Sequence, residues 1–542
     1  MSDPPAALYD AGLAEAARGN LIAARVLLSQ AHALAPHNIP LLVSLGNVLR
    51  RLGETDEARA ALEEGKLRAP EDAALAFELG QVHRILKNTS GARREFELAL
   101  RRHPDHHVCR ETLIFIELSE RNYEAAATLA EAAPGGLAAQ SDLLELICIE
   151  AAARGDDDAS LAYGALAFER LPCARTAMTL ARAEFDSGRY DDAEKRLGWI
   201  QMQPEVAPEI RARAIGTFAD IADKRGDFER AYRNYAASKQ LLRDVYAHTR
   251  SGRPGSYLNL VIRLAEAAAR LDLLKSHPVS DQTAPEIDQA CARHVFILGF
   301  PRTGSTLLEQ CLSGHPDVLT SDESNALGIA TASLLAERDP FAALRDTDDA
   351  VLNEMRGRYW RHMKQRAPVT ARKYFIDKMP FNSVLMGFIP SLFPTAKIVF
   401  AVRDPRDIVL SCFRQRFSMN AATAELCTLA DSVRLFCAVM RLSEMCRAKL
   451  PAPILDCRYE DLVADLPGAL SRISDFTGIP WHDDMVHFSQ RAKRQPLTTV
   501  SAPQLTKGLY DGSGGWLRYE KFLTPHLPAL APWISRFGYQ PC

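Results

Sequence analysis

The run His294–Pro316, HVFILGFPRTGSTLLEQCLSGHP, decides how the rest of the chain is interpreted. Its apolar start, Val295 to Leu298, predicts a buried strand, because a short apolar run that ends at a Gly/Pro turn is typical of one. A segment with helical periodicity follows from Ser305 to Leu312. The run therefore predicts a strand, a loop and a helix, in that order.

The loop GFPRTGST has the outline of a phosphate-binding loop. Gly299 and Gly304 have the spacing of the motif G-x-x-x-x-G-K-[ST], and Ser305-Thr306 end it. Such glycines let successive N–H groups and the positive end of the next helix face one anion. Where a nucleotide triphosphatase has Lys this chain has Ser305, and the nearest cation, Arg302, can bind a phosphate or phosphosulfate directly. An ordinary strand-to-helix turn is the alternative, and the PRTGST core favours the anion site.

Length and composition bound the rest of the molecule. The 542 residues exceed one ordinary core, so at least two domains are expected. With 47% hydrophobic and 25% charged residues the composition is that of a soluble globular protein, and the net charge of -3 gives no global attraction to nucleic acid or an acidic membrane surface. No apolar run reaches about 18 residues and the N-terminus has no basic signal segment, so we expect neither a membrane span nor secretion. Eleven cysteines without a C-x-x-C pair favour reduced thiols and a cytoplasmic protein.

The first half of the chain repeats with a period of 34 residues. Three sets of residues keep this spacing: Pro36, Pro70 and Pro104; Gly12, Gly46 and Gly80; Ala24, Ala58, Ala92 and Ala126. This is the tetratricopeptide (TPR) pattern, in which two helices touch at small residues around an apolar one such as Leu28, Leu62 or Phe96. About seven helical hairpins are predicted before residue 244, stacked into a superhelix. Its concave face commonly binds a peptide or protein partner, and a scaffold or homodimerisation arm is the alternative.

The period ends at residue 244, and a different pattern begins near residue 293. Residues 244–292 contain a loop, one amphipathic helix and a polar, Pro-containing linker. From Arg293 onward strand-like runs alternate with helical ones: HVFILGF, DVLT, KYFIDK, KIVFAVRD and ILDCRYEDL. This alternation predicts a P-loop-like α/β domain with a central parallel sheet and ligands at the carboxyl ends of its strands. The expected domains are a repeat array (1–243), a linker (244–292) and the α/β domain (293–542).

The loop Arg302–Thr306, together with KIVFAVRDPRDIVLSC downstream, resembles the sulfotransferases that use 3′-phosphoadenosine-5′-phosphosulfate (PAPS). The resemblance covers about the last 250 residues, is closest to the tyrosylprotein sulfotransferase branch, and includes its bacterial tetratricopeptide-fused relatives. It implies that PAPS is the sulfuryl donor and that no metal is required. The residues that it assigns to the phosphosulfate are Arg302, Thr303, Gly304, Ser305 and Thr306.

Three side chains are candidates for the chemistry: Arg302, Lys378 and Glu323. Lys378 ends the run KYFIDK and matches the family's catalytic lysine in a similar K-x-P-F context, where its ammonium would face the departing oxygen. Glu323 follows the short strand DVLT, 21 residues after Arg302, which matches the base of the tyrosylprotein branch. A carboxylate there can take the acceptor's proton. Helix capping by Ser321, Asp322 and Glu323 is the alternative.

A second site is expected for the nucleotide's 3′-phosphate. The run KIVFAVRDPRDIVLSC matches the family's signature, with Arg403 at the strand end and Ser411 two helical turns later. Arg406 and Asp407 are interpreted as an ion pair at the start of that helix, and Tyr459 in CRYEDL is expected near the nucleotide.

The segment TTVSAPQLTKGLYDGSGGW resembles the loop that closes over the nucleotide, with Ser501 as a polar contact. Relatives usually carry a basic residue directly before the tryptophan, whereas this chain has Gly514-Gly515-Trp516. Lys507 or Arg518 is the expected replacement.

The function expected from these residues is sulfuryl transfer from PAPS to a hydroxyl acceptor, such as a tyrosine of a protein or peptide, with the repeats recruiting the acceptor or a partner. A P-loop kinase-like phosphotransferase is one alternative, and it predicts a loop lysine that this chain lacks. A non-catalytic TPR adaptor with a relict nucleotide fold is the other, and it predicts loss of the site residues, all of which are present. The motifs carry no information about which acceptor is used.

Overall fold

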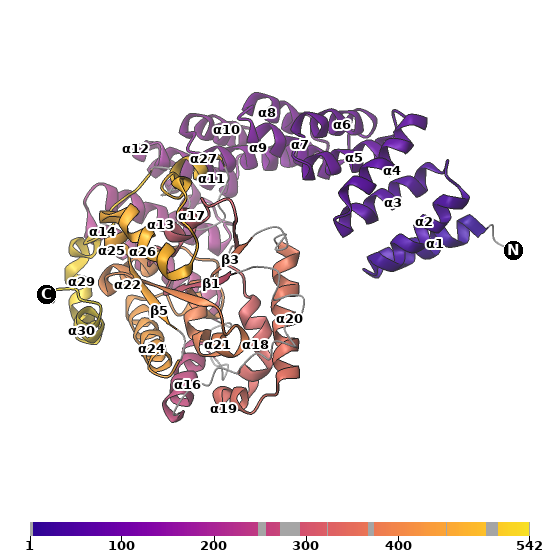
Figure 1. Ribbon diagram of the computed structural model, residues 1–542. Coiled ribbons are helices and arrows are strands. Elements are labelled where there is room, and N and C mark those ends of the chain that lie inside the picture. The colour runs from indigo at the N-terminus through magenta and orange to yellow at the C-terminus, as the bar shows by residue number, and fades with distance from the viewer. Residues whose placement is uncertain are drawn as a thin grey trace. The chain divides into compact units, whose positions relative to one another are not determined.

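The computed structural model describes residues 4–247, 256–271, 293–321, 323–366, 373–450, 453–494 and 508–540. The chain divides into two compact units (Figure 1). The first comprises Met1–Ala152 and Asp156–Ala183, and the second comprises Ala153–Gly155 and Glu184–Cys542.

Residues 4–247 form fourteen helices, which is the number that seven hairpins need. They are α1 (Pro4–Ala17), α2 (Leu21–Leu34), α3 (Ile39–Leu52), α4 (Thr55–Arg68), α5 (Ala73–Ile85), α6 (Thr89–Arg102), α7 (His107–Ser119), α8 (Tyr123–Glu131), α9 (Gly136–Ala153), α10 (Asp157–Arg170), α11 (Ala174–Asp186), α12 (Tyr190–Met202), α13 (Pro208–Lys224) and α14 (Phe228–Val245). The predicted helical repeats are thus confirmed.

The periodic small residues lie where the two helices of a hairpin meet. A Cβ added at Gly46 of α3 would lie 2.5 Å from Leu62 of α4, so only glycine allows this approach. The same contact joins Gly12 to Leu28 and Gly80 to Phe96, at 2.8 Å in both cases. The periodic alanines Ala24, Ala58, Ala92 and Ala126 are fully buried. The packing expected from the 34-residue period is therefore confirmed.

A five-stranded parallel sheet forms the centre of the second unit. Its strands are β1 (Arg293–Gly299), β2 (Val318–Ser321), β3 (Tyr374–Lys378), β4 (Lys397–Val402) and β5 (Ile454–Arg458), in the spatial order β2-β3-β1-β4-β5. All five strand-like runs predicted from the sequence are strands. Because neighbours in a parallel sheet point the same way, the five carboxyl ends meet at one edge.

Side-chain alternation along the strands gives the sheet two apolar faces. Phe296, Leu298 and Phe400 lie in one cluster, with α16, α18, α20, α22, α24 and α30. Val295 and Ile297 lie in the other, with α17, α25 and α26. Helix α17 spans Ser305–Leu312, the range predicted from the sequence.

The remaining helices of the second unit connect and cover these layers. Their bounds, with those just named, are α16 (Tyr257–Arg270), α17 (Ser305–Leu312), α18 (Ala326–Ala336), α19 (Pro340–Arg345), α20 (Asp349–Arg366), α21 (Ile389–Leu392), α22 (Pro405–Arg414), α23 (Ala421–Ala424), α24 (Leu429–Arg447), α25 (Tyr459–Ala464), α26 (Leu466–Thr477), α27 (Phe488–Arg494), α29 (Glu520–Leu523) and α30 (Leu527–Arg536). The 3₁₀ helices are η3 (Pro380–Phe388), η4 (Asp483–Met485), η5 (Gly515–Tyr519) and η6 (Thr524–His526).

The last helical hairpin, α13–α14, shares its core with the α/β part of the chain. Ala219 and Tyr235 belong to the same buried cluster as Phe296 of β1. Tyr232 of α14 stacks on Phe522 of α29, with ring centroids 3.8 Å apart and 6° between the ring planes. The second compact unit therefore includes the end of the predicted repeat array, and the domain limits at residues 243 and 292 stay predictions.

Among the described residues, none of the nine cysteines forms a disulfide bond, and most of them are buried. Among the described helices, none combines the length and apolarity that crossing a membrane would require.

Candidate active site

The carboxyl edge of the sheet carries the predicted site residues in a defined order. Glu323 follows β2, Lys378 ends β3, the loop 300–304 follows β1, Arg403 follows β4, and Tyr459 follows β5. In the spatial order β2-β3-β1-β4-β5, the strands present a carboxylate, an ammonium, the loop 300–304, a guanidinium and an aromatic ring at this edge. Residues from five separate stretches of sequence are thereby brought to one side of the domain.

Lys378 lies between two carboxylates. Its Nζ is 2.9 Å from Glu323 Oε1 and 3.3 Å from Glu309 Oε2. The side chains of Lys378 and Glu309 are 0% and 1% exposed, whereas that of Glu323 is 48% exposed. Burial by itself would lower the pKa of Lys378, but the attraction of Glu309 and Glu323 outweighs it and the pKa is raised. Lys378 is therefore held as an ammonium that contacts one buried and one accessible carboxylate.

Glu309 is a site residue that the sequence analysis did not single out. It lies on α17, all eight residues of which are buried. Strand alternation directs Lys378 toward the sheet face covered by α17, which brings the two charges together. A carboxylate between the apolar pairs Leu307-Leu308 and Cys311-Leu312 is the signal that could have identified it, because a buried charge is normally paired.

The capping alternative for Glu323 does not match the helix that follows. Helix α18 begins at Ala326, and Asn325 occupies its N-cap position. Glu323 lies two residues before that position and contacts Lys378 instead. The other two residues of the predicted cap are Ser321, which ends β2, and Asp322, which lies outside the described residues.

The loop after β1 depends on backbone conformations with positive φ. Gly299, Arg302 and Gly304 have φ values of 152°, 73° and 88°. A Cβ at Gly304 would lie 2.6 Å from the ring of Tyr459, so glycine is required there for space as well as for φ. Arg302 holds a left-handed conformation that non-glycine residues seldom adopt, and such strain clusters at functional sites. The hydroxyl of Thr303 donates to the carbonyl of Phe300 at 2.8 Å and braces the turn.

Two guanidinium groups meet beside this loop. Arg302 Nε donates to Ser411 Oγ at 3.0 Å, and Arg403 donates to the carbonyl of Arg302 at 3.2 Å. The guanidinium of Arg403 lies over the ring of Tyr459, 4.4 Å from its centroid. Desolvation lowers the pKa of Arg302, and the positive charges of Arg403 and Arg414 lower it further. An anion bound here would relieve that repulsion.

Comparison with known proteins identifies the part of the chain that holds these residues. Residues 294–483 match the model of the sulfotransferase family, and residues 15–79 match that of the tetratricopeptide repeat.

The sequence relatives include an uncharacterized protein and two proteins that are named sulfotransferases. An uncharacterized protein of Aquifex aeolicus is 25% identical over 354 residues, which are 63% of this chain and 44% of that protein. Protein-tyrosine sulfotransferase A of Caenorhabditis elegans is 25% identical over 46% of this chain and 67% of its own length. Protein-tyrosine sulfotransferase of Drosophila melanogaster is 24% identical over 46% of this chain and 52% of its own. The chain thus spans about half the length of the relatives it matches.

Two solved structures align with the chain at low scores. The sulfotransferase domain from the curacin biosynthetic pathway is 19% identical, with a TM-score of 0.31, over 45% of this chain and 97% of that one. A tetratricopeptide repeat protein from Parabacteroides merdae is 17% identical, with a TM-score of 0.29, over 44% of this chain and 94% of that one.

The segment that was predicted to close over the nucleotide contacts two of the predicted site residues. Tyr459 donates its hydroxyl hydrogen to the carbonyl of Tyr510 at 2.6 Å, and the carbonyl of Gly512 accepts from Arg403, also at 2.6 Å. The described part of this segment, residues 508–516, therefore lies against Arg403 and Tyr459. Ser501 and Lys507 lie outside the described residues.

The predicted ion pair between Arg406 and Asp407 is wrong. Arg406 pairs with Asp404 at 2.7 Å, because Asp404 is the N-cap of α22 and its carboxylate faces both the backbone and the side chain of Arg406. Asp407 instead accepts the backbone N–H groups of Gly514 and Trp516, at 2.8 Å each. Burial raises the pKa of Asp407 to about 6, although Arg403 opposes this.

The glycines before Trp516 are thus held in place by a carboxylate. Arg406 stacks on the indole of Trp516, 4.2 Å from the ring centroid. Arg518, one expected replacement for the missing basic residue, lies over the ring of Phe228 on α14 at 5.6 Å.

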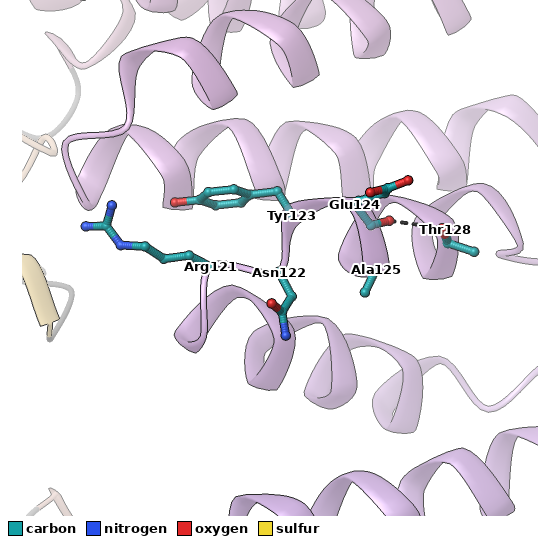
Figure 2. Close-up of a pocket in the computed structure, with 6 residues that line it drawn as sticks. All are labelled: Arg121, Asn122, Tyr123, Glu124, Ala125 and Thr128. Atoms are coloured by element: carbon teal, nitrogen blue, oxygen red, sulfur yellow. Dashed lines mark hydrogen bonds between the residues drawn. The ribbon is translucent and has the colours of Figure 1, made fainter.

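A separate hollow in the first unit contains none of the predicted site residues. It is lined by Arg121, Asn122, Tyr123, Glu124, Ala125 and Thr128 at the start of α8 (Figure 2). Within the described parts of the chain, no group of three or more His, Cys, Asp or Glu side chains is placed to hold a metal ion.

Proposed function

We propose that the protein transfers a sulfuryl group from PAPS to a hydroxyl acceptor. The observation that carries this proposal is the pairing at the sheet edge of a buried ammonium, Lys378, with an accessible carboxylate, Glu323, at 2.9 Å. Sulfuryl transfer needs a base for the acceptor and a cation for the leaving oxygen, and these two groups lie together beside an anion loop. The match of residues 294–483 to the model of the sulfotransferase family supports the same reaction class.

The residues of the edge fit a donor with anionic groups at two positions. Arg302 to Thr306 would hold the phosphosulfate through backbone N–H groups, the start of α17 and the Arg302 side chain. Arg403 and Ser411 would hold the 3′-phosphate, and Tyr459 would lie near the nucleotide. The left-handed backbone of Arg302 and the repulsion between Arg302 and Arg403 support this assignment, because a bound anion offsets both costs.

The reaction assigns different tasks to Glu323 and Lys378. As the acceptor oxygen bonds to sulfur, Glu323 takes the hydroxyl proton, since its carboxylate is accessible. The bond between sulfur and the bridging phosphate oxygen breaks, and Lys378 stabilises the negative charge left on that oxygen. The donor supplies an activated sulfuryl group, and no step requires a metal ion, because Arg302 and Lys378 provide the positive charge.

Glu309 keeps Lys378 charged during this change. When Glu323 becomes protonated, Lys378 loses the attraction of one of its two carboxylates. Glu309, buried 3.3 Å from Nζ, still faces it and cannot exchange protons readily with water. An ammonium has three N–H donors, so Lys378 can contact both carboxylates and still donate to the leaving oxygen.

The acceptor class and the repeats complete the proposal. Relatives that are named protein-tyrosine sulfotransferases support a tyrosine of a protein or peptide as acceptor. The repeat array would recruit the acceptor or a partner through its concave face, as TPR proteins commonly do. A cytoplasmic location, expected from the cysteines, and a homodimer stay predictions.

Nucleotide binding without metal is the first test. Calorimetry with adenosine 3′,5′-bisphosphate (PAP), the desulfated product, should show binding in EDTA. Adenosine 5′-monophosphate (AMP) should bind more weakly, because it lacks the phosphate assigned to Arg403 and Ser411. A strict requirement for Mg²⁺ would favour a phosphotransferase, and no binding in either condition would overturn the proposal. Transfer of ³⁵S from labelled PAPS to proteins of a cell extract would then identify the acceptor.

A further inference from the structure

We propose that the hairpin α13–α14 positions the nucleotide side of the site, with Asp223 as the positioning residue. The inference rests on the proposed function for the identity of the ligand. It concerns the end of α22, the helix that carries Ser411. Three consecutive residues there, 414 to 416, are each held by a side chain of the hairpin.

Asp223 of α13 fixes the last residue of α22. Its carboxylate accepts from Arg414 Nη2 at 2.7 Å and from the Tyr519 hydroxyl at 2.6 Å, and it is 9% exposed. The guanidinium of Arg414 also lies over the rings of Tyr235 and Tyr519, at 5.2 and 5.3 Å. Burial alone would lower the pKa of Arg414, but Tyr235 and Asp223 raise it well above its ordinary value. Arg414 is therefore a charged group enclosed by the hairpin and the C-terminal segment.

The next two residues are held in the same way. Asp220 accepts from Arg416 Nη2 at 2.7 Å, and Lys239 of α14 donates to the carbonyl of Gln415 at 2.5 Å. The side chain of Arg416 also packs on α13 at Gly216, where an added Cβ would lie 2.8 Å from its Nη1. The hairpin thus contacts residues 414–416 through two ion pairs, one hydrogen bond to the backbone and one close approach.

A short path leads from these contacts to the anion loop. The backbone N–H of Gln415 donates to the carbonyl of Ser411 at 3.0 Å. The hydroxyl of Ser411 accepts from Arg302 Nε, also at 3.0 Å. A shift of Gln415 or Arg414 therefore moves Ser411, the residue assigned to the 3′-phosphate, relative to Arg302.

The hairpin α13–α14 does not need these charges in order to pack against the α/β part of the chain. The stacked rings of Tyr232 and Phe522 and the shared apolar core already hold it in place. A partly buried ion pair, as these two are, adds little net stability, because desolvation offsets most of its attraction, and its better-attested role is to fix one arrangement. The location of two such pairs at the end of α22 points to control of that helix end.

The test uses the full chain with Asp223→Asn, which keeps the shape and removes the charge. We expect PAP to bind about tenfold more weakly, within the range by which positioning residues alter affinity at a nearby site. AMP, which lacks the 3′-phosphate, should bind as it does to the wild type. Amide hydrogen exchange in residues 405–415 of the free protein should become faster.

Glu229→Gln is the matched control. Glu229 lies on the same hairpin and pairs with Lys521 at the exposed edge of the same contact, away from residues 414–416. This variant should change neither affinity nor exchange in α22. If Asp223→Asn does not fold, Asp220→Asn replaces it, with the same expected pattern through Arg416.

The outcomes separate this inference from the proposed function. If the wild type does not bind PAP, the proposed function fails, and hydrogen exchange in α22 still decides whether the hairpin orders that helix. Equal PAP affinity of Asp223→Asn and the wild type overturns the inference, as does unchanged exchange in α22. Equal weakening of PAP and AMP also overturns it, because the effect would then be general destabilisation.

Discussion

The two ends of the ligand-binding edge balance charge in opposite ways. At the β2–β3 end one ammonium, Lys378, contacts two carboxylates, one of them fully buried. At the β1–β4 end two guanidiniums, Arg302 and Arg403, are held by a hydroxyl and backbone carbonyls. Under the proposed function, the second arrangement attracts an anion before any reaction, whereas the first gains most when charge moves during the reaction. The difference indicates that binding and chemistry are separable by mutation.

Glu323→Gln should have the largest effect and tests whether the β2–β3 end acts on chemistry alone. It keeps the side-chain shape and removes the base, so kcat should fall by about a hundredfold to ten-thousandfold. PAP affinity should change by no more than about twofold, because the residue acts mainly in the transition state. Initial rates with ³⁵S-labelled PAPS and calorimetry measure the two quantities. Near wild-type kcat would place the base elsewhere, with Asp322 the first residue to test.

Arg403→Ala should produce the reverse pattern at the other end. Loss of a charge-assisted contact to the 3′-phosphate should weaken PAP binding by about tenfold to a hundredfold. At saturating PAPS kcat should change little, since the contact is made in the ground state and the transition state alike. Arg441→Ala, an exposed arginine on α24, is the matched control. A large loss of kcat with intact PAP affinity would contradict the division between the two ends.

Glu309→Gln should give the smallest change in kcat at pH 7. It tests how the carboxylates at the β2–β3 end keep Lys378 charged. Glu309 and Glu323 together raise the pKa of Lys378, so removing one charge lowers that pKa. The alkaline limb of the kcat profile should move to lower pH, with a loss of about tenfold or less at neutral pH. The pH dependence of the stability of the folded protein should change in the same direction. A native pKa above the unfolded one contributes stability that is lost as pH rises from the unfolded value through the native value, so in this variant the contribution should be smaller and its loss complete at lower pH.

Glu354→Gln on α20 is the control for that measurement. Glu354 makes an exposed ion pair with Arg358 and does not contact the site. Its pH profile should match the wild type. An alkaline limb that stays unchanged in Glu309→Gln would show that Glu323 alone sets the charge state of Lys378.

Local chemistry in the sequence was enough to predict much of the fold. The glycines and apolar runs around Arg302 predicted β1 and α17, because turn geometry and helix start depend on neighbouring residues. The period of the first half predicted the contact between Gly46 and Leu62, since a repeat fixes which residues meet. The five strands followed from five apolar runs.

Such local patterns could not predict contacts between segments that are far apart in the sequence. The pairing of Glu309 with Lys378 depends on the rotation of α17 relative to the alternation of β3, which no local signal records. Arg406 was assigned to the wrong carboxylate, because Asp407 binds the backbone of the distant Gly514 and Trp516 and leaves Arg406 to pair with Asp404. The apolar face of α14 looked like that of another repeat, since periodicity shows which residues are buried and not what covers them. For this reason the core shared with the α/β part was missed.

The stacked pair Tyr232 and Phe522 has a consequence for the order in which the chain is synthesised. Hairpins that contact only their neighbours can fold soon after they leave the ribosome. Helix α14 cannot complete its packing until α29 has been translated, after all five strands. The parallel sheet adds to this delay, because its pairings join segments that are far apart in the chain. A nascent chain therefore exposes the apolar face of its last hairpin through most of the synthesis of the α/β part.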